Sequence, residues 1–175
     1  MEFRTRPVAY GSVGWHETVR LRDAVLRTPL GLAFSKAELE QEASQLHLGL
    51  YAGTTLAGVV VLVPPTSDSR IWKLRQMAVA PAFRGKRGGA TLIAAAEREM
   101  RDQDAPEVML HARESAVGFY TGHGYLAEDR VFEEVTIAHR CMWKTLDPTP
   151  PASVHEDLQE KTPLAETVNR SAIDI

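Results

Sequence analysis

Three unlike kinds of sequence follow one another in the segment Gln76-Met77-Ala78-Val79-Ala80-Pro81-Ala82-Phe83-Arg84-Gly85-Lys86-Arg87-Gly88-Gly89-Ala90-Thr91-Leu92. A short apolar strand ends at Pro81, a loop with three cations and three glycines comes next, and an Ala-rich helix then begins. Glycines let the backbone approach a ligand closely, and the free N–H groups and dipole of a helix N-terminus favour an anion. The segment therefore predicts a phosphate-binding loop.

The pattern of this loop narrows the choice of ligand. Neither G-x-x-x-x-G-K-[ST] nor G-x-G-x-x-G occurs, so the common nucleotide-binding patterns are absent. The loop resembles motif A of the GNAT superfamily of acyl-CoA-dependent N-acetyltransferases, which reads [Q/R]-x-x-G-x-[G/A] and holds the pyrophosphate of coenzyme A. Arg84 takes the first position and Gly89 the last, whereas Arg87 replaces the middle glycine. By itself, the loop is also compatible with a surface turn before an ordinary helix.

A second motif strengthens the resemblance. The stretch Ala116-Val117-Gly118-Phe119-Tyr120-Thr121-Gly122-His123-Gly124-Tyr125 is similar to the family's A-x-x-F-Y-x-x-x-G-[F/Y]. It follows the first motif after one expected helix and one expected strand. The resemblance covers roughly Phe3 to Leu146, and the ending Phe132–Met142 looks like that of a small bacterial branch, the ElaA-like proteins.

The resemblance implies an α/β (α+β) GNAT fold. Its central sheet is mixed, mostly antiparallel, of about six to seven strands, flanked by about four helices and splayed at the cofactor strand. Hydrophobic periodicity and turn residues predict strands at 2–10, 47–51, 56–63, 70–80, 107–112, 126–134 and 136–144. The same signals, with a capping box at Ser35–Glu38, predict helices at 15–26, 35–45, 87–103 and 115–123. Residues 1–146 form the acetyltransferase domain, and 147–175 form a Pro-rich, polar C-terminal tail that could hold a short helix at 153–161.

Composition excludes several classes of protein. With 175 residues, 44% hydrophobic and 25% charged, the chain suits one globular domain. A balance of 20 basic against 23 acidic residues argues against a nucleic-acid or nucleotide module. The single cysteine, Cys141, allows no internal disulfide, and the histidines lack metal-ligand spacing. Without a signal-peptide or membrane-spanning pattern, we expect a soluble cytoplasmic protein with no metal, membrane or nucleic-acid partner.

The resemblance implies acetyl-CoA as the acyl donor and assigns residues to it. Backbone N–H groups of the strand would face the pantetheine arm, and the loop would hold the phosphates. An asparagine that many relatives carry is replaced by Arg113, so its pantetheine contact is lost or Arg113 reaches the phosphates or the acceptor instead. The expected cofactor residues are Met77, Ala78, Val79, Arg84, Gly85, Lys86, Arg87, Gly88, Gly89, Ala90, Arg113 and Tyr120.

Tyr120 is the expected general acid that protonates the thiolate of coenzyme A. A phenol near pKa ~10 would match a thiol near ~8.5 after a modest downward shift. The alternative is that Tyr120 only packs against the pantetheine. Tyr125, after Gly124, is expected in the core.

The general base is expected to be Glu134 or His139. Glu133 and Glu134 are adjacent on a strand, so one faces the cleft and the other faces away. His111 is a further candidate base, acceptor contact or structural residue, and Arg22 is a possible substrate contact.

The acceptor is expected to be an amine of a small molecule or a protein. The glutamates at 38, 42, 133 and 134 faintly favour a cationic amine, although surface placement explains them equally well. A homodimer is possible, as is the alternative of a non-catalytic acyl-CoA-binding protein with the same fold.

Overall fold

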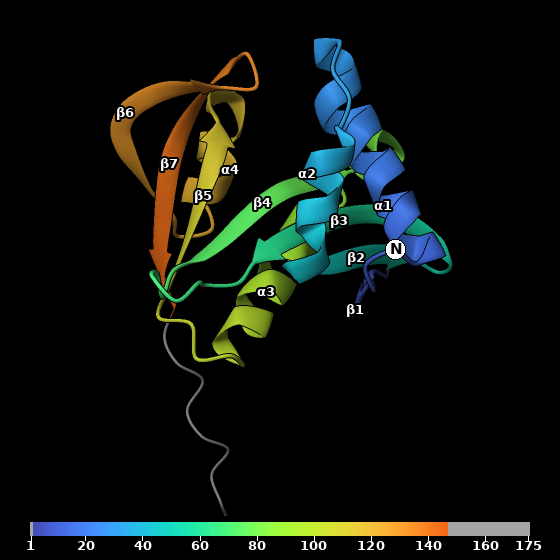
Figure 1. Cartoon of the computed structure of the whole chain (residues 1–175), viewed down its shortest axis with the longest axis horizontal. Coiled ribbons are helices and arrows are strands. Elements are labelled where there is room, and N and C mark those ends of the chain that lie inside the picture. The colour runs from blue at the N-terminus through green and yellow to red at the C-terminus, as the bar shows by residue number, and fades with distance from the viewer. Residues whose placement is uncertain (1, 147–175) are drawn as a thin grey trace, which may run out of the picture.

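The computed structural model describes residues 2–146, so the expected tail and its possible helix at 153–161 lie outside the described residues. Seven strands form one sheet in the order β1-β2-β3-β4-β5-β7-β6 (Figure 1). Every neighbouring pair is antiparallel except β4 and β5, which are parallel. The expected mixed sheet is thus confirmed, with strands β1 (Arg4–Pro7), β2 (Leu46–Ala52), β3 (Thr55–Val63), β4 (Trp72–Val79), β5 (Glu107–Arg113), β6 (Leu126–Glu134) and β7 (Ile137–Thr145).

The α-helices are α1 (Val13–Arg22), α2 (Lys36–Glu40), α3 (Gly88–Arg101) and α4 (Val117–Thr121). The first expected helix, at 15–26, is α-helical only as far as Arg22. A π-helical turn at Asp23–Arg27 follows it directly. The capping box before α2 is confirmed, since the side chains and backbone N–H groups of Ser35 and Glu38 bond each other reciprocally. No helix within residues 2–146 combines the length and apolar character needed to cross a bilayer.

Helices cover both faces of the strands at the centre of the sheet (Figure 1). Leu50 and its neighbours along one face pack with Leu92 of α3 in the main core. Gly49 and Tyr51 point to the opposite face, where α1 lies. The run Ala57–Leu62 of β3 is therefore buried throughout, as its unbroken apolar sequence predicts.

The sheet opens between β4 and β5. The two parallel strands pair only where Trp72–Leu74 meets Val108–Leu110, although β4 stays bonded to β3 as far as Val79. From Arg75 onward, β4 has no partner on its β5 side within residues 2–146. The splay expected at the cofactor strand is thus present, and it leaves a V-shaped gap in the sheet.

A β-bulge marks the start of this gap. The register between β3 and β4 shifts after Arg75, so that two residues of β4, Gln76 and Met77, oppose Val60 of β3. Gln76 has a φ of 50°, a left-handed value that costs free energy in a residue with a side chain. Bulges bend a strand and increase its twist, which turns β4 away from β5.

A tight hairpin closes the other side of the gap. Val135 and Thr136 connect β6 to β7 with φ values of 52° and 64°, as a two-residue hairpin loop requires. Glu134 is the last residue of β6 and pairs with Ile137 across this loop. The loop thus fixes which face of the hairpin Glu134 occupies.

Candidate active site

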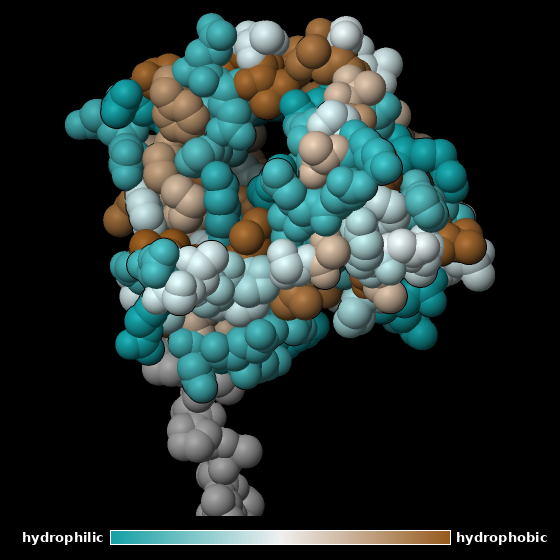
Figure 2. All heavy atoms as spheres, viewed as in Figure 1, coloured by the Kyte–Doolittle hydropathy of each residue, from teal (hydrophilic) through white to brown (hydrophobic). Residues whose placement is uncertain are grey.

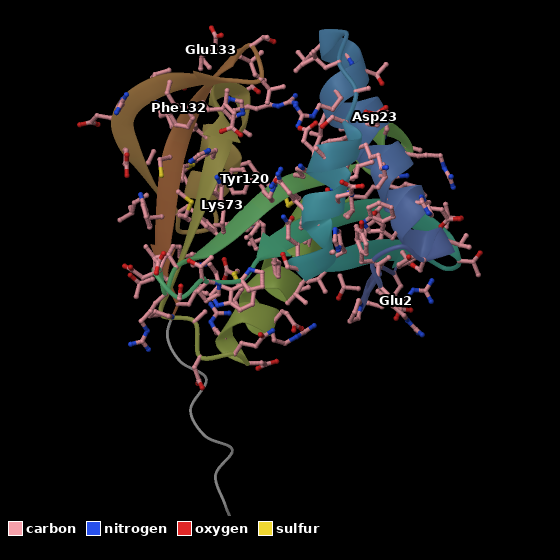
Figure 3. All side chains as sticks on the ribbon, in the orientation of Figure 1. Glu2, Asp23, Lys73, Tyr120, Phe132 and Glu133 are labelled. Atoms are coloured by element: carbon pink, nitrogen blue, oxygen red, sulfur yellow. The ribbon has the colours of Figure 1, made fainter. Side chains whose placement is uncertain are left out.

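A cavity of about 260 Å³ fills the gap between β4 and β5. Figure 2 shows the molecule hollowed here, between the β5–β7 side and the side that carries α1 and α2. In Figure 3, Lys73 and Tyr120 lie beside the point where β4 separates from β5, and Asp23 marks the helical wall opposite. The polar and titratable residues that line the cavity are Arg27, Lys73, Arg75, Gln76, His111, Arg113, Tyr120, Glu134 and His139.

The loop before α3 presents free hydrogen-bond donors. Within residues 2–146, no protein acceptor lies in hydrogen-bonding geometry of the backbone N–H groups of residues 85–90. The first intrahelical bond of α3 is made by the N–H of Thr91 to the Arg87 carbonyl. A cationic groove beside this helix start is lined by Lys86, Arg87 and Arg98. The sequence-predicted phosphate loop therefore has both the unused donors and the positive charge that an anion needs.

The backbone conformation of Arg87 is one that suits glycine, the residue that the related motif has at this position. Its φ is 64°, so the backbone there is left-handed, a conformation that glycine adopts without steric cost. Arg87 adopts this conformation although it carries a side chain, which costs roughly 1–2 kcal/mol. In return, Arg87 adds a cation to the groove.

The backbone of β4 has free donors facing the gap. The N–H of Ala80 donates to the Ala57 carbonyl at 2.9 Å, toward β3. Since N–H directions alternate along a strand, the N–H groups of Met77 and Val79 point to the other side. That side has no strand partner in the described chain, whereas the Ala78 side chain is buried.

Tyr120 lines the cavity from α4, but its expected pKa shift is wrong. Only 8% of the residue is exposed, and burial, with no hydrogen bond from the described chain, is what acts on its hydroxyl. Burial disfavours the phenolate and raises the pKa of Tyr120 to about 12, rather than lowering it toward that of a thiol. Tyr120 therefore carries its proton at all ordinary pH values. Tyr125 lies fully inside the core, as predicted.

Glu134 faces the cavity and Glu133 is exposed, which resolves the adjacent pair. The Glu134 carboxylate lies 2.5 Å from Nδ1 of His111, and Nζ of Lys73 is 3.5 Å from the same nitrogen. Burial opposes the ionisation of Glu134, but the hydrogen bond and charge of His111 and the charge of Lys73 outweigh it and lower its pKa. Glu134 is thus a carboxylate at neutral pH.

His139 also lines the cavity, from β7. Its Nδ1 donates to the Ile137 carbonyl at 2.9 Å, and its ring stacks on Phe132. This contact assigns the proton to Nδ1, which leaves Nε2 as a hydrogen-bond acceptor in the neutral ring. Both residues predicted as bases therefore reach the same cavity.

The side chain of Arg113, on β5, extends to the segment that follows α1. Its guanidinium donates to the Leu26 carbonyl at 2.9 Å, which ties β5 to the turn after α1. The contact places the Arg113 side chain beside Leu26, which also lines the cavity.

Arg22 is not a substrate contact, contrary to expectation. It has no exposed surface, and its guanidinium binds both carboxylate oxygens of Glu42, at 2.6 and 2.8 Å. Glu42 also accepts hydrogen bonds from Trp15 and from His47. These four residues form a buried polar network behind the cavity.

The network supports the cavity through the bulge. Arg22 donates a further short hydrogen bond to the side-chain oxygen of Gln76. The residue with the strained backbone in β4 is thus held by a buried ion pair between Arg22 and Glu42. The role of Arg22 is to position β4, not to touch a ligand.

The glutamates that faintly favoured a cationic amine do not gather in the cavity. Of these glutamates, Glu38 is paired with Arg27, Glu42 with Arg22, and Glu133 is exposed. Only Glu134 reaches the cavity. Surface placement and ion pairing therefore account for the other three.

Sequence reasoning missed Lys73 and Arg75 in this site. They alternate along β4, so both point to one face of a strand whose other residues are largely apolar. Two cations at a spacing of two residues in a buried strand were the available signal.

Comparison with known proteins places the chain among acetyltransferases. A family model described as "Acetyltransferase (GNAT) domain" matches residues 27–146. The uncharacterized N-acetyltransferase YitI of Bacillus subtilis is 25% identical over 140 residues, covering 77% of this chain and 94% of the relative.

Solved structures agree on the fold. Escherichia coli ElaA superposes with a TM-score of 0.68 at 18% identity, over 82% of this chain and 99% of that protein. A Bacillus subtilis acetyltransferase, solved in complex with CoA, superposes with a TM-score of 0.64 at 18% identity, over 83% and 99% of the two chains. The architecture built around the gap is therefore shared with these proteins.

Proposed function

Because the chain belongs to the GNAT acetyltransferase family, whose chemistry is acyl-CoA-dependent acyl transfer, we propose that it moves an acetyl group from acetyl-CoA to a primary amine by direct attack in a ternary complex. One observation carries this proposal. A buried phenol, Tyr120, and an ionised carboxylate, Glu134, line the same cavity, at the open edge of β4. A proton donor and a proton acceptor that share one cavity are what amide formation from a thioester and an amine requires.

The residues of the loop and of β4 fit coenzyme A. The donors of residues 85–90 would hold its phosphates, with Arg84, Lys86 and Arg87 supplying charge. The N–H groups of Met77 and Val79 would bond the pantetheine arm like the edge of an added strand. When bound, acetyl-CoA supplies an activated thioester carbonyl.

Tyr120 would donate its proton to the departing sulfur. Burial keeps the phenol protonated, although a pKa of about 12 also makes it a weaker acid than the thiol, near ~8.5, that it would form. Positioning supplies most of the remaining rate enhancement, because the reaction joins two bound molecules.

Glu134 would accept the proton of the attacking amine, directly or through water. Changing it to glutamine is expected to lower kcat by about 10- to 100-fold, since the amide keeps a hydrogen bond to His111 but cannot take a proton. The pKa of Glu134 is lowered from 4.5. The carboxylate therefore takes up a proton, and loses this role, only as the pH falls below 4.5. The measurement is the pH profile of kcat with saturating substrates.

Glu133→Gln is the matched control, because the neighbouring carboxylate is exposed and faces away. We expect it to leave kcat unchanged. If Glu134→Gln is equally silent and His139→Gln lowers kcat, the base is His139 instead.

Binding of the donor is tested by thermal unfolding with and without acetyl-CoA. Ligand at about 100 times its Kd is expected to add roughly 2.7 kcal/mol of stability. Gly89→Trp should abolish the shift, because even a Cβ at Gly89 would lie 3.0 Å from the Phe119 ring at the helix start. Glu17→Trp, on the exposed side of α1, should keep it.

Different outcomes separate the candidate functions. No shift in the folded wild-type protein would contradict acetyl-CoA as a ligand. A shift without turnover on any amine would favour the alternative of a non-catalytic acyl-CoA-binding protein.

A further inference from the structure

The cavity carries more positive than negative charge. Among the described residues, its lining includes the cations Arg27, Lys73, Arg75 and Arg113, whereas Glu134 is the one carboxylate. A cleft lined mainly by one sign of charge concentrates ligands of the opposite sign. It also repels an amine whose only charge is an ammonium group.

Arg75 differs from the other cations, because its guanidinium lacks a protein partner within residues 2–146. Arg27 is paired with Glu38 at 2.9 Å, and Arg113 donates to the Leu26 carbonyl. Arg75 is half-buried, and its nitrogen atoms remain open to the cavity. Burial lowers the pKa of Arg75, as expected for a charge held away from water.

The two carboxylates whose charges act on Arg75, Glu42 and Glu134, already bond other residues. Glu42 is bonded within the buried network behind the bulge, and Glu134 is bonded to His111. A guanidinium has five N–H donors in a planar fork that matches a carboxylate. Those of Arg75 are therefore available to a ligand in the cavity.

Arg75 lies too far from the phosphate loop to bind the phosphates of coenzyme A. The phosphate loop begins beyond the end of β4 at Val79, four residues after Arg75 in a strand that rises about 3.3 Å per residue. The two sites are thus separated by roughly 10 Å or more along β4. Arg75 lies at the acceptor end, near Arg27 and Gln76.

We propose that the acceptor is an amine that also carries a carboxylate, as a small amino acid does, and that Arg75 binds this carboxylate. The inference rests on the proposed function and names the substrate class of the same site. A carboxylate on the fork of Arg75 would anchor the acceptor with two parallel hydrogen bonds. The remaining cations would then lower the pKa of the acceptor's ammonium group, which favours the neutral amine that attacks.

Matched acceptor pairs test the inference. Each pair consists of an amino acid and the amine left by its decarboxylation, such as tyrosine and tyramine or histidine and histamine. For the wild-type protein, kcat/KM is expected to favour the carboxylated member of the preferred pair by about 10- to 100-fold, because a charge-assisted bidentate bond is lost in the other. The measurement is coenzyme A release with acetyl-CoA as donor.

Arg75→Gln is expected to bring this ratio near one, chiefly by raising KM for the carboxylated member. Arg70→Gln is the matched control, since Arg70 precedes β4 on the same segment and is exposed. It should leave the ratio unchanged. A second readout needs no turnover: the carboxylated member should raise the melting temperature of the acetyl-CoA-saturated wild-type protein, but not that of Arg75→Gln.

Each outcome decides the inference. It is overturned if the decarboxylated amines are equal or better substrates, if Arg75→Gln lowers both members of a pair alike, or if neither member is acetylated and no carboxylated amine shifts the melting temperature. If acetyl-CoA and the amino acid both bind but no acetylation occurs, the binding of a carboxylate by Arg75 stands, and the proposed transferase activity fails.

Discussion

Tyr120→Phe is expected to lower kcat by about 100- to 10,000-fold, the range typical of a lost general acid. The change removes one oxygen atom from the cavity and leaves the ring that packs beside the cofactor strand. Affinity for acetyl-CoA should therefore stay close to that of the wild-type protein. Stability should change by less than about 0.5 kcal/mol, because the hydroxyl has no partner in the described chain to lose.

The pH dependence follows from the direction of the Tyr120 shift. A group whose pKa is raised to about 12 loses its proton only as pH rises through that value. Activity should therefore show no alkaline loss attributable to Tyr120 in the range where the protein is assayed. An alkaline limb near pH 8–9 that vanishes in Tyr120→Phe would contradict the effect of burial described here.

Tyr51→Phe is the control for this experiment. Tyr51 is as deeply buried as Tyr120, at 7% exposed, but it lies in β2 on the α1 face of the sheet. We expect it to retain wild-type kcat. If Tyr120→Phe also retains it, Tyr120 only packs against the cofactor and a different donor protonates the leaving sulfur.

Glu42→Gln is expected to destabilise the protein by about 3–5 kcal/mol, because it leaves Arg22 buried without its counter-charge. Both residues are almost completely buried, at 0% exposed for Arg22 and 1% for Glu42. The measurement is the free energy of unfolding from denaturant titration at pH 7. Loss of the pair should also loosen Gln76 and the bulge that bends β4, so acetyl-CoA affinity is expected to fall as well.

Acid should reproduce part of this loss in the wild-type protein. Burial opposes the ionisation of Glu42, but the hydrogen bonds from His47 and Arg22 and the charge of Arg22 outweigh it and lower its pKa from 4.5 to about 2. A lowered pKa stabilises the folded state above pH 4.5 and ceases to do so as pH falls toward 2. About 3 kcal/mol should be lost across that window, and the difference between wild type and Glu42→Gln should shrink with it.

An exposed ion pair provides the comparison. Glu114 contacts Arg140 at 2.6 Å, but both side chains are partly exposed to solvent. Glu114→Gln should therefore cost less than about 1 kcal/mol. Equal losses for the two variants would show that the buried network has no special role.

Local signals in the sequence were sufficient for much of the fold. The capping box at Ser35–Glu38, the glycines and cations of residues 84–89, and the alternating strands depend on neighbours only a few residues apart. The two motifs also predicted the helix that begins at Gly88 and the short helix that carries Tyr120.

Features that depend on distant residues were not visible in this way. Arg22 is separated by 20 residues from Glu42 and by 54 from Gln76, and nothing local marks it as buried. Its charge suggested a ligand contact, but folding enclosed it. The sequence suggested a lowered pKa for Tyr120, whereas burial raises it. The direction of this shift depends on packing that only the folded structure determines.

The two-residue loop at Val135 and Thr136 ties the length of the β6–β7 hairpin to the face that Glu134 occupies. Side chains alternate between the faces of a strand, so inserting or deleting one residue near this loop would exchange the places of Glu133 and Glu134. Viable length variants of this hairpin should therefore differ by pairs of residues. Variants that differ by such pairs would keep a carboxylate on the cavity face while the side chains at the tip change.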